Sequence, residues 1–436
     1  MKIQNNINIV WLRRDLRLND NTALIKAGSN NLPVLLLFIF DEDILDKLEP
    51  NDSRVTFIYD RLHELNKSLK KHNSSIRIIK GKVLHVWESI FKEYQINAVY
   101  ANEDYEPYAI KRDTEIMLLC RNHDVNFNLY KDHVIFARDE VLKKDGKPYT
   151  VYTPYKNQWL KQFKELSEEI DEVQGEKQSV YYAPLNYEFP SLQSLGFERG
   201  KMKTRNFSIE HLEDYASERD LPFKDAGSYL GPHLRFGTVS IREIVAKVKQ
   251  ASHTFLLELI WREFFMQIMY HFPQSTGRNF KSKYDWIKWR NNEDDFARWC
   301  NGTTGYPMVD AGMRELNQTG YMHNRVRMVT ASFLCKHLLI DWQWGEAYFA
   351  EKLLDFELSS NVGNWQWAAG TGCDAAPYFR VFNPILQQKK FDPDYNYIRK
   401  WIPELGTVAY PQAMVEHSMA RKRALEAYKK GIESYG

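Results

Sequence analysis

The residues best suited to chemistry lie close together between Asp341 and Asp392, in the run DWQWGEAYFAEKLLDFELSSNVGNWQWAAGTGCDAAPYFRVFNPILQQKKFD. Within it, Asp355 to Thr371 predicts a loop between helices that bears carboxylates, amides and paired tryptophans. Indole rings can stack on a flat heteroaromatic ligand, and carboxylates or amides can hydrogen-bond its edge. These residues alone support two interpretations equally, a ligand pocket or a helix junction packed by tryptophan.

Two further pairs of residues have helical spacing. Glu258 precedes Trp261 by three residues in ELIWRE, so both side chains would lie on one face of a helix. Asn324 and Met328 in GYMHNRVRM are four residues apart and would share a face in the same way. Taken singly, a helical Glu is most often a surface residue and a Met most often fills a core.

Composition limits the class of protein. A chain of 436 residues and 51.6 kDa is long enough for two or three domains. The net charge of +2 requires no polyanionic partner, so a nucleic-acid surface would have to be a local basic patch. The four cysteines lack metal-ligand or redox spacing, and we expect neither a disulfide framework nor a metal site.

Hydropathy points to a cytoplasmic protein. No apolar run reaches the roughly 20 residues that span a bilayer. The opening MKIQNNINIVWLRRD also lacks the layout of a signal peptide. We therefore expect no association with a membrane.

The elements that must position these residues change character along the chain. Residues 1–130 alternate amphipathic helices with the short apolar runs INIVWL, PVLLLFIF, IRIIKG, INAVYAN and VNFNLY, which predicts a doubly wound parallel α/β sheet. No GxGxxG follows the first run, so a nicotinamide-type dinucleotide site is not supported. Residues 131–204 predict an irregular inter-domain connector, and residues 205–436 predict a large all-helical domain.

Several long motifs in one order resemble the photolyase/cryptochrome family, most closely its class I photolyases for cyclobutane pyrimidine dimers. They are WLRRDLRLNDNTAL, ELIWREFF, GYPMVDAGMREL, GYMHNRVRMVTASFL and NVGNWQWAAGTGCDAAPYFRVFNP. The match runs from about Ile9 to the final helix, and several long motifs are far more specific than one short pattern. The resemblance implies an N-terminal antenna domain and a helical domain that binds FAD and DNA.

The resemblance assigns the FAD diphosphate to Tyr215 and to the loop GSYLG, which comprises Gly227, Ser228, Tyr229, Leu230 and Gly231. The family usually has TSxLS at this loop. Since only Ser228 and Leu230 agree with that pattern, backbone amides near the following helix would carry more of the phosphate contact.

The resemblance also implies the residues around the flavin ring. It places Arg327 and Asp355 beside the isoalloxazine, and Glu357 where many members have Asp to accept from flavin N3–H. Asn361 falls near flavin N5, where an amide that cannot ionise would tune the reduced ring. Plant cryptochromes typically have Asp there, so Asn361 favours repair over signalling.

On the substrate side, the resemblance gives Glu258 the role of hydrogen-bonding a carbonyl of the dimer, as a protonated carboxyl in a dry pocket. Trp261 and Trp367 would form the apolar wall against a flipped-out dimer, and photolyases are among the enzymes known to flip bases. Other positions implied to face the lesion or its strand are Arg219, Asn324, Arg325, Met328 and Gln387, with Lys389 and Lys390 nearby. Phosphate contacts would position the duplex while the cavity selects the lesion.

Three positions discriminate among branches of the family. Photolyases for (6-4) lesions have His at the positions of both Asn324 and Met328. Their reaction needs an acid there, and neither an amide nor a thioether can act as one. DASH-type cryptochromes usually have Tyr where this chain has Trp367. The dimer is therefore the predicted lesion, with a (6-4) photolyase and a blue-light photoreceptor cryptochrome as alternatives.

The resemblance further implies an electron-transfer chain through Trp365, Trp342 and Trp289, which would reduce photoexcited flavin by short hops to the surface. An indole can be oxidised transiently, whereas Leu or Phe cannot. Each of these tryptophans taken alone would be interpreted as core packing.

Together these matches imply light-driven repair, in which photoexcited reduced FAD passes an electron to a flipped-out pyrimidine dimer in damaged DNA and then recovers it. We expect a monomer with a second, antenna chromophore of the methenyltetrahydrofolate or deazaflavin type. Tyr108 and Ala109 replace the Asn-Glu pair of folate-binding relatives, so a second flavin or an empty antenna site also stays open.

Overall fold

The structure is a computed structural model that describes residues 3–173, 180–210 and 212–435. These residues form two compact units. Unit 1 comprises Met1–Val141, Asn157–Phe207 and Tyr229–Gln250, and unit 2 comprises Leu142–Lys156, Ser208–Ser228 and Ala251–Gly436. The predicted combination of a parallel α/β sheet and a helical region is confirmed, while the boundaries at residues 130 and 204 stay a prediction.

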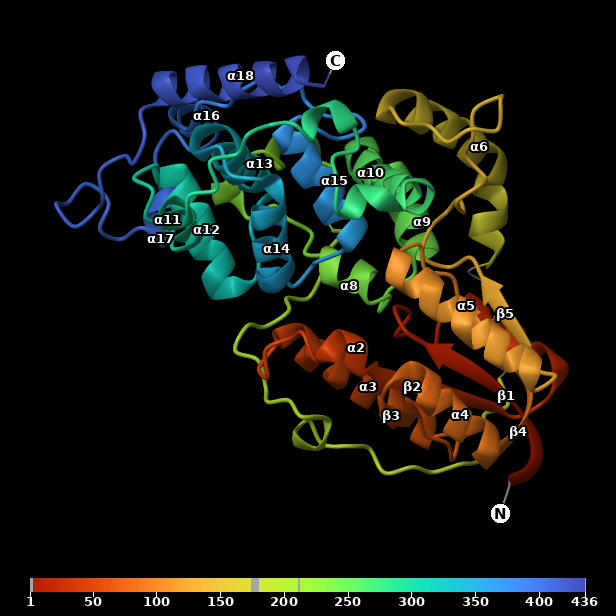
Figure 1. The fold of residues 1–436 in the computed structure, drawn as a ribbon. Coiled ribbons are helices and arrows are strands. Elements are labelled where there is room, and N and C mark those ends of the chain that lie inside the picture. The colour runs from red at the N-terminus through yellow and green to blue at the C-terminus, as the bar shows by residue number, and fades with distance from the viewer. Residues whose placement is uncertain (1–2, 174–179, 211, 436) are drawn as a thin grey trace. The chain divides into compact units, whose positions relative to one another are not determined.

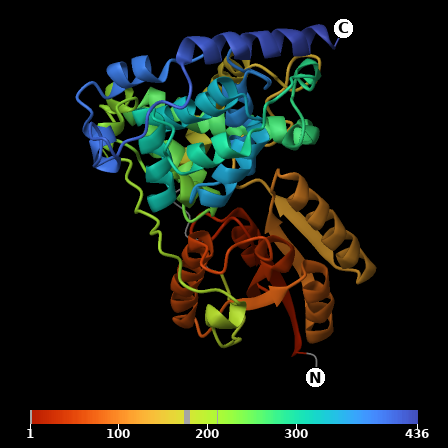
Figure 2. The same cartoon turned by 60° about the vertical axis from the view of Figure 1, so that its left-hand side comes forward.

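Unit 1 is built on a five-stranded sheet with the order β3-β2-β1-β4-β5. Its strands are β1 (Ile3–Leu12), β2 (Val34–Asp41), β3 (Arg77–Gly81), β4 (Tyr94–Asn102) and β5 (Asn126–Tyr130). Every neighbouring pair is parallel, and Figure 2 shows the strands as adjacent arrows. All five runs predicted as strands are strands. β2 is buried throughout, whereas the edge strands β3 and β5 contain no buried residue.

Helices cover the two faces of this sheet. Apolar residues of α1 (Thr22–Ala27) and α3 (Ser53–Lys70) pack with Val10, Leu36 and Phe38 on one face. Residues of α4 (Val83–Glu93) and α5 (Pro107–Asn122) pack with Trp11, Leu35 and Leu37 on the other. The alternation along β1 and β2 is the period of two that a strand imposes. The short helices α2 (Glu42–Leu45), α8 (Gly231–Arg235) and most of α9 (Ile241–Ala251) complete unit 1.

The segment predicted as an irregular connector contains a long helix, α6 (Tyr152–Val173). Pro154 lies in its first turn, where a missing N–H is tolerated. Asp374 Oδ2 accepts a hydrogen bond of 2.9 Å from the backbone N–H of Tyr152. The helix begins with a capping partner 222 residues away in the chain, which local patterns do not reveal.

Unit 2 is helical, as Figure 1 shows, and its helices form the site. They are α7 (Tyr215–Glu218), α10 (His253–His271), α11 (Glu293–Cys300), α12 (Pro307–Thr319), α13 (Asn324–Ser332), α14 (Trp342–Lys352), α15 (Leu358–Ala369), α16 (Pro384–Phe391), α17 (Asn396–Trp401) and α18 (His417–Glu433), with a π-helical segment at Phe333–Leu338. In the described part of the chain, no helix combines the length and the apolarity needed to cross a bilayer.

Helix α15 corrects the prediction of a loop between Asp355 and Thr371. Its Ser, Asn and Gly residues are weak helix formers, which favoured the loop. Packing explains the helix: a Cβ on Gly363 would lie 2.2 Å from Cδ1 of Phe265 in α10, so only glycine allows the two helices to approach this closely. Gly370 ends α15 with a φ of +83°, a conformation that glycine adopts without strain.

Candidate active site

A pocket lies among α13, α14, α15 and the turn before α15, and it encloses about 620 Å³ when the open solvent at its mouth is included. Eight residues that the sequence singled out line it: Asn324, Arg327, Met328, Asp355, Glu357, Asn361, Trp365 and Trp367. Residues from two separate motifs, GYMHNRVRM and NVGNWQWAAG, thus meet around one cavity.

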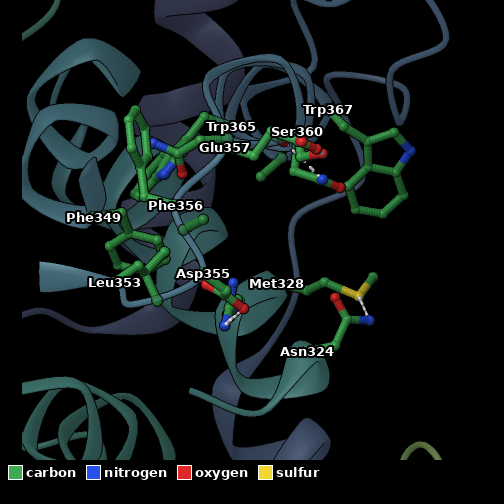
Figure 3. A pocket seen from close by; sticks show the side chains of 15 residues that line it. Asn324, Met328, Phe349, Leu353, Asp355, Phe356, Glu357, Ser360, Trp365 and Trp367 are labelled. Carbon is green, nitrogen blue, oxygen red and sulfur yellow. Dashed lines mark hydrogen bonds and ion pairs between the residues drawn. The ribbon is translucent and has the colours of Figure 1, made fainter. Parts of the chain in front are cut away.

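The two sides of the pocket differ in chemistry. Figure 3 shows the apolar side chains of Phe349, Leu353 and Trp365 on one side, and Asn324, Met328 and Trp367 on the other. The rings and aliphatic groups of the first side suit a flat heteroaromatic ligand. The second side offers an amide, a thioether and an indole to a different molecule.

An ion pair lines the pocket between these two sides. Arg327 Nη2 lies 2.8 Å from Asp355 Oδ2, and Arg327 Nε donates to the carbonyl oxygen of Met322 at 2.7 Å. The second carboxylate oxygen, Asp355 Oδ1, is buried and accepts no hydrogen bond from the described part of the chain. A buried acceptor without a donor is costly, so this atom fits a ligand that brings an N–H or O–H group to the pocket.

Asn361 is held in one orientation by Glu346 of α14. Its Nδ2 donates to the carbonyl oxygen of Glu346 at 3.0 Å and to Glu346 Oε1 at 2.8 Å. Both amide hydrogens are therefore used, and Asn361 Oδ1 remains to accept from a ligand. Burial raises the pKa of Glu346, and the hydrogen bond from Asn361 opposes that rise.

Glu357 is nearly buried at the start of α15 and makes polar contacts with both carboxylate oxygens. Arg262 Nη2 lies 3.1 Å from Glu357 Oε1, and the Ser360 hydroxyl donates to Glu357 Oε2 at 3.0 Å. A donor from a ligand would share these oxygens, each of which has more than one lone pair.

The predicted face of Asn324 and Met328 is present in α13. Asn324 Nδ2 lies 3.9 Å from Met328 Sδ, and both side chains line the pocket. His323, the neighbour of Asn324, accepts through Nδ1 from the backbone N–H of Arg325 at 3.2 Å and caps the helix. Burial lowers the pKa of His323 to about 4, which makes a structural, neutral imidazole.

Glu258 and Trp261 lie on α10 and are not among the residues that line this pocket. Glu258 Oε1 is 2.5 Å from Arg219 Nη1. Burial raises the pKa of Glu258, and the Arg219 guanidinium opposes the rise. The Trp261 ring stacks on the Tyr152 ring with centroids 3.5 Å apart, and the Tyr152 hydroxyl donates to the carbonyl oxygen of Leu257.

The three tryptophans proposed for electron transfer belong to one apolar cluster of unit 2 or pack against it. Trp365 is buried and meets Phe349 edge-on at 4.9 Å. Trp342 is buried and donates through Nε1 to Asn279 Oδ1 at 2.9 Å. Trp289 is half-buried, with its ring 5.8 Å from that of Tyr428. Trp365 and Trp342 are buried to the same extent, and Trp289 is the more exposed of the three; their role in electron transfer stays a prediction.

None of the residues assigned to the diphosphate lines the pocket as the structure describes it. Tyr215 packs against Phe255 at 5.0 Å, and burial raises its pKa to about 12. In the GSYLG loop, Tyr229 has a φ of +53°, and its hydroxyl accepts from Arg205. Gly227 and Ser228 belong to unit 2 and Tyr229 to Gly231 to unit 1, so this assignment stays a prediction.

Comparison with known proteins identifies the family. Residues 8–174 match the family described as "DNA photolyase", and residues 255–409 match the "FAD binding domain of DNA photolyase". A deoxyribodipyrimidine photo-lyase of Vibrio cholerae is 34% identical, with 97% of this chain and 99% of that protein aligned. The chain belongs to the photolyase/cryptochrome family.

Solved photolyase structures agree in fold over nearly the whole chain. A class III photolyase from Agrobacterium tumefaciens has a TM-score of 0.84 at 31% identity and covers 99% of both chains. An archaeal photolyase from Sulfolobus tokodaii with two FAD molecules has a TM-score of 0.82 at 32% identity, covering 97% of this chain and 99% of that one. The FAD-binding match contains every residue of the pocket, whereas Tyr215 and the GSYLG loop lie outside it.

Sequence reasoning missed several polar and aromatic residues of the photolyase site. Glu346, Phe356, Ser360 and Tyr152 contact predicted residues or line the pocket. Glu346 lies 15 residues before Asn361, with no periodic relation to it. Only the Tyr-Thr-Pro run at Tyr152 carried a signal, because Pro favours the first turn of a helix.

Proposed function

We propose that this protein is a deoxyribodipyrimidine photo-lyase that binds FAD and uses light to split cyclobutane pyrimidine dimers in DNA. The observation that carries the proposal is the two-sided pocket inside the FAD-binding region: rings and an unpartnered acid oxygen on one side, and Asn324, Met328 and Trp367 on the other. One side suits the flavin and the other suits a pyrimidine dimer.

The residues present fit FAD at its ring. Asp355 Oδ1 lacks a donor, Asn361 presents an oxygen, and Glu357 has acceptor capacity left on a nearly buried carboxylate. Together these three acceptors suit the N–H edge of an isoalloxazine, while Trp365 and Phe349 supply apolar surface. When bound and reduced, FAD would supply, on excitation by light, the electron that opens the dimer.

The protein's own residues would hold the dimer and exclude water. Trp261 and Trp367 offer indole faces to a flipped-out dimer, and the stacking of Tyr152 on Trp261 fixes the plane of that ring. The carboxyl of Glu258, whose pKa burial raises, would donate a proton to hydrogen-bond a pyrimidine carbonyl as charge develops there. Local cations such as Arg325 and Lys390 would contact the DNA backbone.

The two rival functions would require other side chains in the pocket or would give other experimental results. A (6-4) enzyme would need an acid at Asn324 or Met328, and both are uncharged. A photoreceptor would use the same flavin and tryptophans to change its binding partners under light. The assignment to class I photolyases stays a prediction, because a class III enzyme also shares the whole fold.

The proposal includes a second chromophore, and several chemical classes are candidates for it. The archaeal neighbour contains two FAD molecules, and a folate or a deazaflavin are the other candidates. Spectra of the released chromophores of purified protein separate these possibilities.

The test is light-dependent repair of an oligonucleotide with one thymine dimer by chemically reduced protein. We expect repair by the wild type in light and none in the dark. Glu258→Ala should repair severalfold less per absorbed photon, while Glu258→Gln, which can still donate a hydrogen bond, should retain more activity than the Ala variant. Absence of repair by reduced, flavin-loaded wild type overturns the proposal.

A further inference from the structure

Two neighbouring residues of opposite charge tie two helices of the site together. Arg219 Nη1 lies 2.5 Å from Glu258 Oε1 in α10, and Asp220 Oδ1 lies 2.7 Å from Arg325 Nη2 in α13. The four side chains are between 17% and 36% exposed, so both pairs are accessible to ions. Both pairs are part-buried, yet solvent reaches each of their side chains, so a competing anion can replace either carboxylate.

The surroundings of Arg325 suit the binding of a second anion. Its guanidinium lies 4.3 Å from the centroid of the Phe391 ring, and the same ring has Lys390 Nζ at 5.0 Å. Phe391 therefore gathers two cations at the end of α16. Arg325 Nε is buried and donates no hydrogen bond to any residue in the described ranges. Asp220 is the one carboxylate that pairs with Arg325 among the residues the structure describes.

Each of the two ion pairs occupies a side chain that the proposed function needs for a different contact. A phosphate and Asp220 compete for one guanidinium, because both are anions that favour the same donor geometry. The Arg219 guanidinium favours the charged form of Glu258, against the effect of burial, which raises the pKa of that carboxyl, whereas a hydrogen bond to a pyrimidine carbonyl requires a protonated carboxyl. Both restraints come from adjacent positions, so a single displacement of this segment relieves both.

We propose that Arg219 and Asp220 form a latch that holds Glu258 and Arg325. The latch is released as a unit when DNA phosphates bind Arg219 and Arg325, and this release frees the carboxyl of Glu258 for the lesion. Asp220 is then a specificity residue, because it masks a phosphate-binding arginine until a lesion site holds the duplex in place. The latch rests on the proposed photolyase function and adds a residue to it.

The first test compares Asp220→Asn with wild type by fluorescence anisotropy, on a duplex with and without one thymine dimer over a range of salt. Each added phosphate contact steepens the dependence of log affinity on log salt by about 0.9. We expect that increase for Asp220→Asn on undamaged duplex, with tighter binding, and an unchanged slope on the dimer duplex, where Arg325 already contacts phosphate.

Asp214→Asn is the matched control, since Asp214 is an exposed acid beside α7 whose side chain does not cap the helix. It removes the same charge and should leave the salt slope unchanged. Equal affinity and slope for Asp220→Asn and wild type on undamaged duplex would overturn the latch. If the wild type still splits dimers, that result leaves the photolyase proposal intact; failure of the wild type to split dimers is a separate result.

A second test follows the protonation of Glu258 in the wild type, with Glu258→Gln and Arg219→Gln for comparison. Infrared difference spectra should show a protonated carboxyl appearing when dimer duplex binds, with the band absent from Glu258→Gln. In Arg219→Gln the band should be present before DNA is added. A wild-type spectrum without that band on binding would contradict release of Glu258.

Discussion

Glu346 and Asn361 show how one side chain decides what another can offer. Asn361 uses both amide hydrogens on Glu346, and this leaves an acceptor for the ligand rather than a donor. The type of residue 361 was visible in the sequence, but its orientation was not. The same holds for Asp355, whose unpartnered oxygen only the three-dimensional arrangement reveals.

Trp289 tests the tryptophan chain at the scale of one residue. Replacing it by Phe keeps the packing against Tyr428 but removes a ring that can be oxidised transiently. We expect photoreduction of oxidised flavin to slow at least severalfold, and repair by chemically reduced protein to stay almost unchanged. Transient absorption after a light flash measures the first, and dimer splitting measures the second; an unaltered photoreduction rate would remove Trp289 from the chain.

Lys336 is a buried lysine in the π-helical segment. Its Nζ donates to the carbonyl oxygens of Ala369 at 2.6 Å and Tyr378 at 3.2 Å, and lies 3.7 Å from the centroid of the Tyr428 ring. Burial lowers the pKa of Lys336 from 10.5 to about 7. Between these two values the unfolded chain binds a proton that the folded chain does not, so stability rises with pH in that window.

Lys336→Met should abolish this contribution, because Met has similar length and no charge. The free energy of unfolding of the wild type should rise between pH 7.5 and 9 relative to the variant, by up to about 1.4 kcal/mol per pH unit. Lys429→Met, at an exposed position of α18, serves as the control and should behave like the wild type. Parallel stability profiles for wild type and Lys336→Met would show that Lys336 keeps its ordinary pKa.

At the scale of elements, the close approach of α10 and α15 sets the geometry of the pocket. Gly363→Ala places a methyl group against Phe265, and overpacking of this kind costs about 1–3 kcal/mol. We expect a lower denaturant midpoint and weaker flavin retention for this variant. Gly277→Ala has no atom within 4 Å of the new methyl group and should be neutral or slightly stabilising. If both variants match the wild type, α10 and α15 do not pack as described.

The elements also show what local patterns predict. The central strands of unit 1 followed from apolar runs such as PVLLLFIF, because burial on both faces leaves a continuous apolar signature. The edge strands β3 and β5 are only half-buried or exposed and followed from shorter apolar runs. Helix α15 was not predicted by local patterns, since its Ser, Asn and Gly residues favour a loop. The contact between Gly363 and Phe265, which only the structure shows, favours the helix. Helix α6 was missed because Asp374, its capping partner, is remote in sequence.

The candidate site was predicted better than the helix that carries it. Asn324, Met328, Arg327 and Asp355 were placed by motif resemblance, and the structure brings them to one pocket. Glu258 and Trp261 share a helix as their spacing predicts, but the ion pair to Arg219 and the stacked Tyr152 were outside the reach of periodicity.

At the scale of the whole molecule, the pocket, the latch residues and the tryptophans all belong to unit 2. The net charge of +2 gives the chain little general attraction to DNA, so recognition depends on a few local cations. One unit thus contains everything that the proposed chemistry needs apart from the diphosphate loop, part of which belongs to unit 1.

The most direct measurement of this account is the number of dimers split per protein molecule. Flavin-loaded protein is reduced, freed of excess reductant, and illuminated with an excess of dimer-containing oligonucleotide under anaerobic conditions. If the electron given to each dimer returns to the cofactor, as we propose, every protein molecule repairs many dimers and the flavin spectrum remains that of the reduced form. Repair that stops at one dimer per molecule while the flavin oxidises, or repair that proceeds equally in the dark, would contradict the account.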